Sequence, residues 1–376
     1  MVSRPQIIKT ANAKSPIQQI IEMANWGARF LVTPNDYVNY RLYEGGKGNA
    51  DALQFLSSIR AKDIQNVVNR EPKLLQNKLT YDAHYSALGL PIPKSIAVIA
   101  KSGLETKYPI LNDEGEFIRF ISKLVSSGKH LVIKEVSGKQ GAGVLVIVDL
   151  IEVEGYKFFL LSNGATKRID HALKAIFAPG AVWLVQERLD QHCLLKSLNP
   201  TSLNTMRLGT FRNQDGSVEV DYAALRIGRP FSQVDAFAHG GLVVKIDEQT
   251  GMFARMGFQK PKYSLEMFSK HPDSGIEFEG TQMPFWDQII DLAKEFATHA
   301  GNNKMVGWDV AVTPEGPVFV EGNHHWDAQL AQAGAAGLVD DEFLARLERE
   351  AGLTWSSSEL PKLELARCLR ILLRLQ

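Results

Sequence analysis

Residues 305–323 read MVGWDVAVTPEGPVFVEGN, two apolar runs on either side of a Pro-Glu-Gly turn. A turn of this composition between apolar, valine-rich runs predicts a β-hairpin. With the turn centred on Glu315, the period of two in a strand places Asp309 opposite Glu321. Two like charges in that position repel unless a cation lies between them, and Mg2+ prefers carboxylate oxygens. The pattern therefore predicts a magnesium site; a solvated hairpin whose acids happen to align is the alternative.

The same parity assigns a face to the other residues of the hairpin. Asn323 joins Asp309 and Glu321 on one face and supplies an amide oxygen as a further ligand. Ala311 and Phe319 are expected on that face as well. The opposite face belongs in a core and carries the valines Val310, Val312, Val318 and Val320.

Length and composition favour an ordinary soluble protein of two or three domains, since the chain has 376 residues. Lys and Arg number 42, as do Asp and Glu, so the charge does not indicate nucleic acid or an acidic membrane as the main partner. The cysteines, Cys193 and Cys368, match no metal-binding spacing. No stretch approaches the roughly 18 apolar residues of a membrane span. We expect a cytoplasmic protein without a transmembrane segment.

Both ends of the chain have helical patterns. Residues 1–72 are predicted to form a helical N-terminal region. The last predicted helix, Leu363 to Leu375, alternates leucines with arginines, which suits a helix docked on the core or one lying on a membrane surface. The first helix has an apolar stripe made of Ile17, Ile20, Ile21, Met23 and Ala24.

A phosphate site is indicated where Lys134, in an apolar β-branched run, precedes the glycine-rich turn 137–143. Apolar neighbours bury the stem of a lysine and hold its ammonium group in one place. Gly138, Gly141 and Gly143 let backbone N–H groups approach phosphate oxygens. The order of residues matches neither a Walker loop nor a dinucleotide fingerprint. An ordinary flexible turn is the alternative.

Two further strands carry candidate residues. The stretch AVWLVQERL, residues 181–189, offers a backbone edge, Glu187 and Leu189 to an adenine or ribose; a strand ending at solvent is the alternative. Arg207 lies in an apolar strand and needs a carboxylate or phosphate partner if it is buried. The pattern leaves open the roles of three histidines, His239, His324 and His325.

Taken in order, these segments resemble an ATP-grasp enzyme of the sugar-transfer-associated branch, over residues 36 to about 332. The order of the short motifs is more specific than any one of them. They are Asp36-Tyr37, Asn77-Lys78, Lys134 with its glycine turn, Val185-Gln186-Glu187, Asn204-Thr205-Met206-Arg207, Gly240-Gly241, Gly307-Trp308-Asp309 and Glu321-Gly322-Asn323.

This resemblance implies an α+β fold in which two α+β lobes clasp ATP. The helical region is expected over residues 1–72, the N-terminal lobe over 73–185 and the C-terminal lobe over 186–376. The resemblance also implies roles for particular residues. The phosphates contact Lys78, Lys134, Gly138, Gly141 and Gly143; adenine is held by Gln186, Glu187 and Leu189; two Mg2+ ions bind Asp309, Glu321 and Asn323; the catalytic residues are Arg207, Lys134 and Asn204.

The implied activity is ADP-forming carboxylate ligation. ATP phosphorylates a carboxylate, and an amine or another nucleophile such as a thiol attacks the acyl phosphate, on a saccharide, amino acid or peptide-like substrate of polysaccharide biosynthesis. A kinase with a stable phosphorylated product and a nucleotide-binding module without turnover are the alternatives. A hydrolase acid pair would leave Lys134, Asn323 and the glycine turn without a role. Nucleic acid is not expected as a partner.

Overall fold

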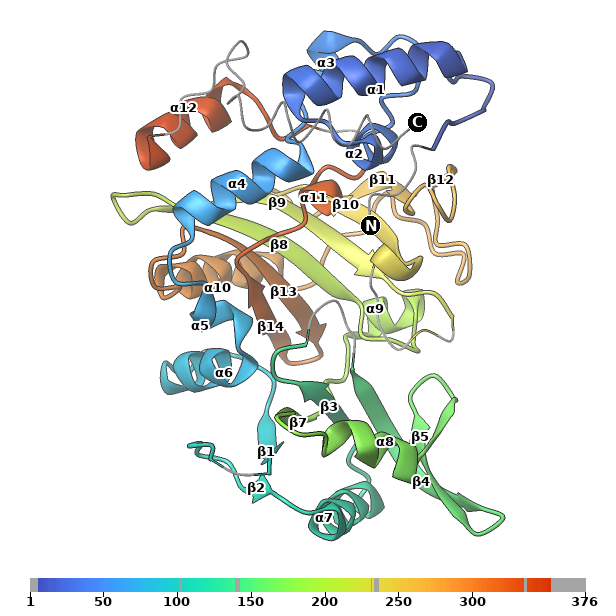
Figure 1. The fold of residues 1–376 in the computed structure, drawn as a ribbon, viewed down its shortest axis with the longest axis vertical. Helices are drawn as coiled ribbons and strands as arrows, with labels where there is room; N and C mark the ends of the chain where they lie inside the picture. The colour runs from blue at the N-terminus through green and yellow to red at the C-terminus, as the bar shows by residue number, and fades with distance from the viewer. Residues whose placement is uncertain are drawn as a thin grey trace.

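Two lobes are stacked along the long axis of the molecule, each built on its own sheet (Figure 1). The computed structural model describes residues 6–101, 103–138, 143–230, 232, 237–334 and 337–352. The predicted Gly141 and the predicted helix from Leu363 to Leu375 lie outside these ranges. Within them, no helix has the length and apolar character that crossing a membrane requires.

Helices α1 to α3 lie at the far end of the upper lobe, and α4 and α5 lead from there toward α6 (Figure 1). Side-chain caps set where several of these helices begin. Ser15 accepts the N–H of Gln18 at the start of the first helix, and Thr33 and Asp36 form a capping box at the second. The helices are α1 (Pro16–Phe30), α2 (Pro34–Asn39), α3 (Asn49–Leu53), α4 (Ser58–Val68) and α5 (Pro72–Gln76).

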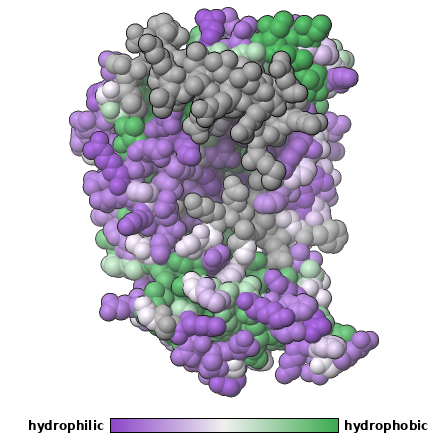
Figure 2. All heavy atoms as spheres, in the orientation of Figure 1, coloured by the Kyte–Doolittle hydropathy of each residue, from purple (hydrophilic) through white to green (hydrophobic). Residues whose placement is uncertain are grey.

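The apolar stripe predicted on α1 is wrong for most of its members. The buried face carries Met23, Trp26 and Phe30, which pack with Tyr37 of α2. The predicted isoleucines lie on the outer face and form a green patch at the top of the molecule (Figure 2). Their exposed fractions are 71% for Ile17, 55% for Ile20 and 53% for Ile21.

The lower lobe contains a seven-stranded sheet in the order β2-β1-β7-β3-β4-β5-β6, antiparallel except for the β1–β2 pair. Helices α7 (Glu114–Ser126) and α8 (Ile169–Ile176) contribute to the core on one face of this sheet. The strands are β1 (Ser95–Ile99), β2 (Ile110–Leu111), β3 (Leu131–Glu135), β4 (Leu145–Val153), β5 (Tyr156–Leu161), β6 (Thr166–Arg168) and β7 (Trp183–Glu187).

The upper lobe contains a seven-stranded antiparallel sheet in the order β12-β11-β10-β9-β8-β13-β14. Its strands are β8 (Thr205–Arg212), β9 (Val218–Ile227), β10 (Leu242–Ile246), β11 (Phe253–Phe258), β12 (Met267–Phe268), β13 (Met305–Thr313) and β14 (Gly316–Asn323). The helical elements of this lobe are α9 (Cys193–Leu198), η1 (Phe237–His239), α10 (Trp286–Thr298), α11 (Ala328–Ala331) and α12 (Asp341–Ala351). Helix α10 packs in the core of one face, and α4, α11 and α12 pack on the other.

Helix α6 (Lys78–Ala87) joins the two lobes. Asn77 caps its first turn, and Tyr85 stacks on Phe296 of α10 with ring centroids 4.7 Å apart. The helix therefore packs on the core of the upper lobe, although it was assigned by sequence to the lower lobe, residues 73–185. The predicted end of that lobe also falls inside β7, a central strand of the lower sheet.

The hairpin of β13 and β14 pairs Asp309 with Glu321, as predicted, but the register then shifts by one residue. Val310 pairs with Phe319, so Val320 is the extra residue of a β-bulge. The prediction assumed one register along the whole hairpin. The bulge instead moves the β14 residues between Glu321 and the turn to the opposite face of the sheet.

The bulge corrects the predicted faces of β14. Phe319 was expected beside the acids, but it is fully buried in the core and stacks on Phe296 at 4.2 Å. Val310 and Val312 lie in the same core, as predicted. Val320 was expected in that core and instead lines the cavity described below.

Candidate active site

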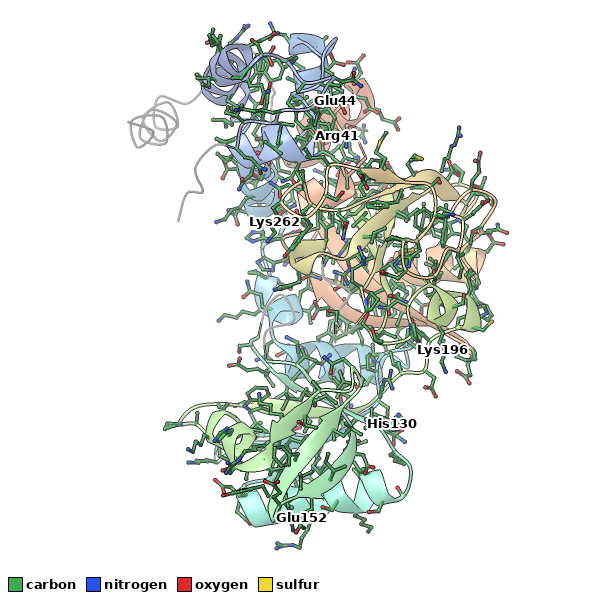
Figure 3. All side chains as sticks on the ribbon, turned by 90° about the vertical axis from the view of Figure 1, so that its right-hand side faces the viewer. Arg41, Glu44, His130, Glu152, Lys196 and Lys262 are labelled. Atoms are coloured by element: carbon green, nitrogen blue, oxygen red, sulfur yellow. The ribbon has the colours of Figure 1, made fainter. Side chains whose placement is uncertain are left out.

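A cavity of about 350 Å³ lies between the facing surfaces of the two lobes. His130, at the top of the lower lobe, and Lys196, at the underside of the upper lobe, mark the two sides of this junction in Figure 3. Most of the residues predicted for the site meet here. The cavity is lined by Lys78, Lys134, Gly138, Gln186, Glu187, Leu189, Arg207, Asp309, Glu321 and Asn323, among others.

Lys134 is the buried cation of the lower wall. It alternates along β3 with Ile133, which packs in the core below, so its side chain emerges on the face toward the cavity. It is 7% exposed, and no described residue forms a hydrogen bond or ion pair with its ammonium group. Burial lowers the pKa of Lys134 to about 8, with Glu321 opposing the shift and Lys78 adding to it. This positive charge is therefore available to an anion in the cavity.

Lys78 is the second lysine of this wall, at the first turn of α6. Its Nζ donates to the carbonyl oxygen of Gly138, 2.7 Å away, which ties the helix to the start of the glycine-rich turn. Gly143, at the other end of the turn, has a φ of 75° and does not line the cavity. We therefore assign Gly143 to the turn geometry, where a left-handed backbone favours glycine.

The strand β7 brings Gln186 and Glu187 to the cavity, and Leu189 follows it. Glu187 forms ion pairs with Lys94, at 3.2 Å, and with Lys129. Its hydrogen bond with Lys129 and that with Lys94 lower the pKa of Glu187, so its carboxylate is already neutralised by two lysines. Sequence reasoning did not identify these partners because both lie in other segments.

Asp309, on the upper wall, is held between two arginines. Arg207 Nε lies 2.5 Å from Oδ1 of Asp309, and a terminal nitrogen of Arg226 lies 3.0 Å from Oδ2. Burial opposes ionisation of Asp309, but the two guanidinium groups outweigh it and hold its pKa well below the usual range. The acid partner predicted for Arg207 is confirmed.

Arg226 was missed by the sequence analysis. It lies in β9, donates a hydrogen bond to the hydroxyl of Thr205, and lines the same cavity. Its sequence context, Ala-Ala-Leu-Arg-Ile, is an arginine inside an apolar strand. That is the same signal that singled out Arg207, so the pattern was sufficient to find both.

Glu321 and Asn323 present oxygen atoms that fit a hard cation. No described residue forms a hydrogen bond or ion pair with the Glu321 carboxylate, and burial and Asp309 raise its pKa. Asn323 donates through its nitrogen to the carbonyl of Gly307, 3.3 Å away, which leaves its oxygen for the cavity. Within the described ranges, His, Cys, Asp and Glu side chains form no metal-binding group of three. A cation at Glu321 would therefore use Asn323, water and phosphate oxygens, with Asp309 joining only on release from an arginine.

The structure corrects the catalytic role predicted for Asn204. This side chain is fully buried and does not line the cavity. Its nitrogen donates to Gln191 and to the carbonyls of Leu195 and Asn199, and its oxygen accepts the N–H of Gly228. Both the nitrogen and the oxygen of the Asn204 side chain therefore have partners inside the upper lobe, and the residue stabilises the turn before β8.

The histidines of undecided role differ in position. His325 lines the cavity, and its Nε2 lies 2.7 Å from Oδ1 of Asn66. Its ring packs against that of His324, with centroids 4.1 Å apart. His239 is exposed at the end of η1.

The fold is of the α+β class, with two lobes and a cavity between their sheets. A model of the sugar-transfer associated ATP-grasp family matches residues 62–346, and the chain belongs to that family. The predicted fold class is thereby confirmed. No curated protein matches the chain in sequence.

Solved structures with a similar fold include several named as synthetases and ligases. An ADP complex of N5-carboxyaminoimidazole ribonucleotide synthetase has a TM-score of 0.39 and 12% identity, over 71% of this chain and 52% of that one. D-alanyl-alanine synthetase A from Vibrio cholerae has a TM-score of 0.38 and 15% identity, over 79% and 65%. L-amino acid ligase from Bacillus licheniformis has a TM-score of 0.34 and 12% identity, over 68% and 42%. This chain spans less than two thirds of each of these structures.

Proposed function

We propose that this protein is an ATP-dependent carboxylate ligase that works through an acyl phosphate and releases ADP and phosphate. The carboxylate belongs to a saccharide, an amino acid or a peptide-like molecule, and the second substrate is an amine. The family's description, sugar-transfer associated, supports a place in polysaccharide biosynthesis.

The observation that carries this proposal is the opposition of charges across the cavity. Lys78 and Lys134 of the lower wall face Asp309 and Glu321 of the upper wall. A triphosphate fits between such walls, because its oxygens are attracted by the lysines and, through divalent cations, by the acids. Lys134 and Glu321 have no hydrogen-bond or ion-pair partner among the described residues, so a neutral ligand would leave both buried groups without a direct countercharge.

In the first step, a carboxylate oxygen attacks the γ-phosphorus of ATP; the new bond joins carboxylate and phosphorus, and the β–γ bridging bond breaks to give ADP. The lysines neutralise the phosphate oxygens during this transfer. Arg207 and Arg226 are our candidates for holding the carboxylate, since a guanidinium matches two carboxylate oxygens. Mg2+ ions, two by the resemblance, would supply further charge neutralisation at Glu321, Asn323 and Asp309. In the second step, the amine attacks the acyl carbon, and phosphate leaves.

Two alternatives remain from the sequence analysis. A kinase would stop after the first step and release a stable phosphorylated product. A nucleotide-binding module would bind ATP without turnover. The second is disfavoured because a module without turnover would be free to lose part of this set, whereas both lysines and Asp309, Glu321 and Asn323 are all present in the cavity wall.

Hydroxylamine provides the test, because it captures an acyl phosphate as a hydroxamate without requiring the natural amine. The protein is incubated with ATP, Mg2+, hydroxylamine and a panel of uronic acids, amino acids and short peptides. We expect a hydroxamate, with ADP and phosphate formed in equal amounts, only when an accepted acid is present. AMP and pyrophosphate would contradict the acyl phosphate route. A phosphorylated product stable to hydroxylamine would favour the kinase.

A further inference from the structure

The carboxamide of Gln186 is fixed by a neighbouring strand. Gln186 in β7 lies directly opposite Ser95 in β1, and its Nε2 donates to the Ser95 hydroxyl oxygen over 3.0 Å. The side chain is 5% exposed and lines the cavity. No described residue donates a hydrogen bond to its oxygen, Oε1. With the nitrogen directed at Ser95, Oε1 is the atom that Gln186 offers to a ligand.

The direction of this hydrogen bond is set by Asp82 of α6. The Ser95 hydroxyl lies 2.5 Å from Oδ2 of Asp82, and the Tyr108 hydroxyl lies 2.5 Å from Oδ1. Burial and the Asp82 carboxylate raise the pKa of Tyr108, so this phenol keeps its proton and donates it. A carboxylate accepts and does not donate, so the Ser95 proton points to Asp82. Ser95 can then only accept from Gln186.

The consequence is a hydrogen-bond acceptor of fixed orientation in the wall of the cavity. The two ends of a free carboxamide are nearly the same size, and it can turn over to present its NH2 group instead. The chain of hydrogen bonds from Gln186 to Ser95 and from Ser95 to Asp82 prevents the carboxamide from turning over. Asp82 is 2% exposed, so this order is set behind the wall, out of reach of a ligand.

A fixed acceptor at this place discriminates between purine bases. Adenine has an amine at C6, which donates, whereas hypoxanthine and guanine have a carbonyl oxygen there, which accepts. Val144, Val146 and Leu189 give the same part of the cavity apolar surface for a planar ring. The inference rests on the proposed function, in which the triphosphate is that of adenosine. We propose that Asp82 and Ser95 are positioning residues that act through Gln186 to make the cavity select ATP over ITP.

The test is the ratio of the dissociation constants of ITP and ATP, measured by calorimetry on the full chain in Mg2+. We expect the original protein to prefer ATP by about tenfold. With ITP, the hydrogen bond from the adenine amine is lost, and the C6 carbonyl oxygen of hypoxanthine faces Oε1 of Gln186, so that two acceptors oppose each other. In Ser95→Ala, Gln186 can turn over, so the ratio falls toward one through tighter binding of ITP. Asp82→Asn shifts the ratio in the same direction, because an amide can donate to Ser95 and reverse its proton.

Two further variants separate positioning from general damage. Ser95→Thr keeps the hydroxyl group and should therefore keep the preference for ATP. Ser127→Ala removes an exposed hydroxyl group of the same lobe and should leave the ratio unchanged. A merely structural role for Ser95 would weaken both nucleotides equally, and an unchanged ratio in Ser95→Ala overturns the inference. Equal affinity for ATP and ITP in the original protein also overturns it, but leaves the proposed ligase intact. Failure of the original protein to bind either nucleotide counts against the proposed function itself.

Discussion

The two walls of the cavity treat their charges differently. On the lower wall, Lys134 is buried without an ion-pair partner among the described residues, and its pKa is lowered to about 8. On the upper wall, Asp309 is bound by both Arg207 and Arg226, and its pKa is lowered. The lower wall thus offers a positive charge to an anion. On the upper wall, the charge of Asp309 is already balanced by Arg207 and Arg226.

This difference suggests an order of events. A triphosphate would reach the ammonium group of Lys134 without displacing a hydrogen-bond or ion-pair partner among the described residues. Glu321 would hold a cation without losing a hydrogen-bond or ion-pair partner among the described residues, whereas Asp309 would have to share its carboxylate with two guanidinium groups. Displacement of a guanidinium from Asp309 by a cation would allow that arginine to bind a carboxylate, and would link cation binding to the substrate role that we propose for Arg207 and Arg226.

Glu321→Gln is expected to have the largest effect. The variant keeps the shape of the side chain but removes a carboxylate that has no hydrogen-bond or ion-pair partner among the described residues, so cation affinity falls. We expect ligase turnover to drop by about a thousandfold, the scale of losing a major electrostatic contribution to a transition state. Glu315→Gln, in the exposed turn of the same hairpin, is the control and should retain full activity. Near-normal turnover of Glu321→Gln would remove this residue from the mechanism.

Lys134→Met tests the lower wall through two opposite effects. Loss of the ammonium group should weaken ATP binding by at least about tenfold. The folded protein should gain about 1 to 3 kcal/mol at pH 7, because burial of an unpartnered cation is relieved. Lys157→Ala, on exposed β5 of the same sheet, should change neither quantity.

The stability gain has a defined pH dependence. Burial lowers the pKa of Lys134 from its usual 10.5 to about 8 in the folded protein, so the unfolded chain holds this proton more tightly. The penalty in the original protein is complete below pH 8 and is relieved as the pH rises toward 10.5. Urea unfolding at pH 7 and pH 9.5 should therefore show a smaller difference between Lys134→Met and the original protein at the higher pH. A constant difference would contradict the burial argument.

Gly307→Ala tests how closely Trp326 and Arg207 pack against β13 in the upper lobe. A Cβ at this position would lie 2.6 Å from Cβ of Trp326 and 3.2 Å from Cδ of Arg207. We expect a loss of about 1 to 3 kcal/mol in unfolding free energy, as for other overpacked sites. Gly48→Ala, where an added Cβ meets nothing within 4 Å, is the matched control. Equal stability of the two variants would show that Trp326 is not tightly packed against β13.

A smaller effect is expected from pH on nucleotide affinity. Lys134 is charged below its pKa of about 8 and loses its proton above it. The dissociation constant of ATP should rise several-fold between pH 7 and pH 9 in the original protein. In Lys134→Met, the same titration by calorimetry should be flat over this range. An equal slope in both proteins would assign the dependence to another group.

The sequence was sufficient for features that follow from local pattern. A charged residue inside an apolar strand predicted Lys134 and Arg207, and turn composition predicted the hairpin with Asp309 opposite Glu321. That pairing was correct although the assumed register was not, because the bulge at Val320 begins only after the acids. A bulge leaves no clear mark in a valine-rich strand, so the burial of Phe319 was not predictable.

Other misses depended on tertiary partners. Gln186 was assigned to adenine by resemblance, but Asp82 and Ser95, which fix its amide, lie in other segments of the chain. Asn204 is a residue type common in active sites and lies in a motif next to Arg207. Only its four hydrogen bonds inside the upper lobe show that its role is structural. The apolar stripe predicted on α1 does not identify the buried face, because both faces of that helix carry apolar residues and Trp26 and Phe30 occupy the core.

A crystal structure with Mg2+ and a non-hydrolysable ATP analogue tests the central claim most directly. The account predicts that the phosphates lie within hydrogen-bond distance of Nζ of Lys78 and Lys134, and that a Mg2+ ion contacts Glu321. It also predicts that the adenine amine faces Oε1 of Gln186. An analogue bound outside this cavity, or phosphates that contact neither lysine, would contradict it.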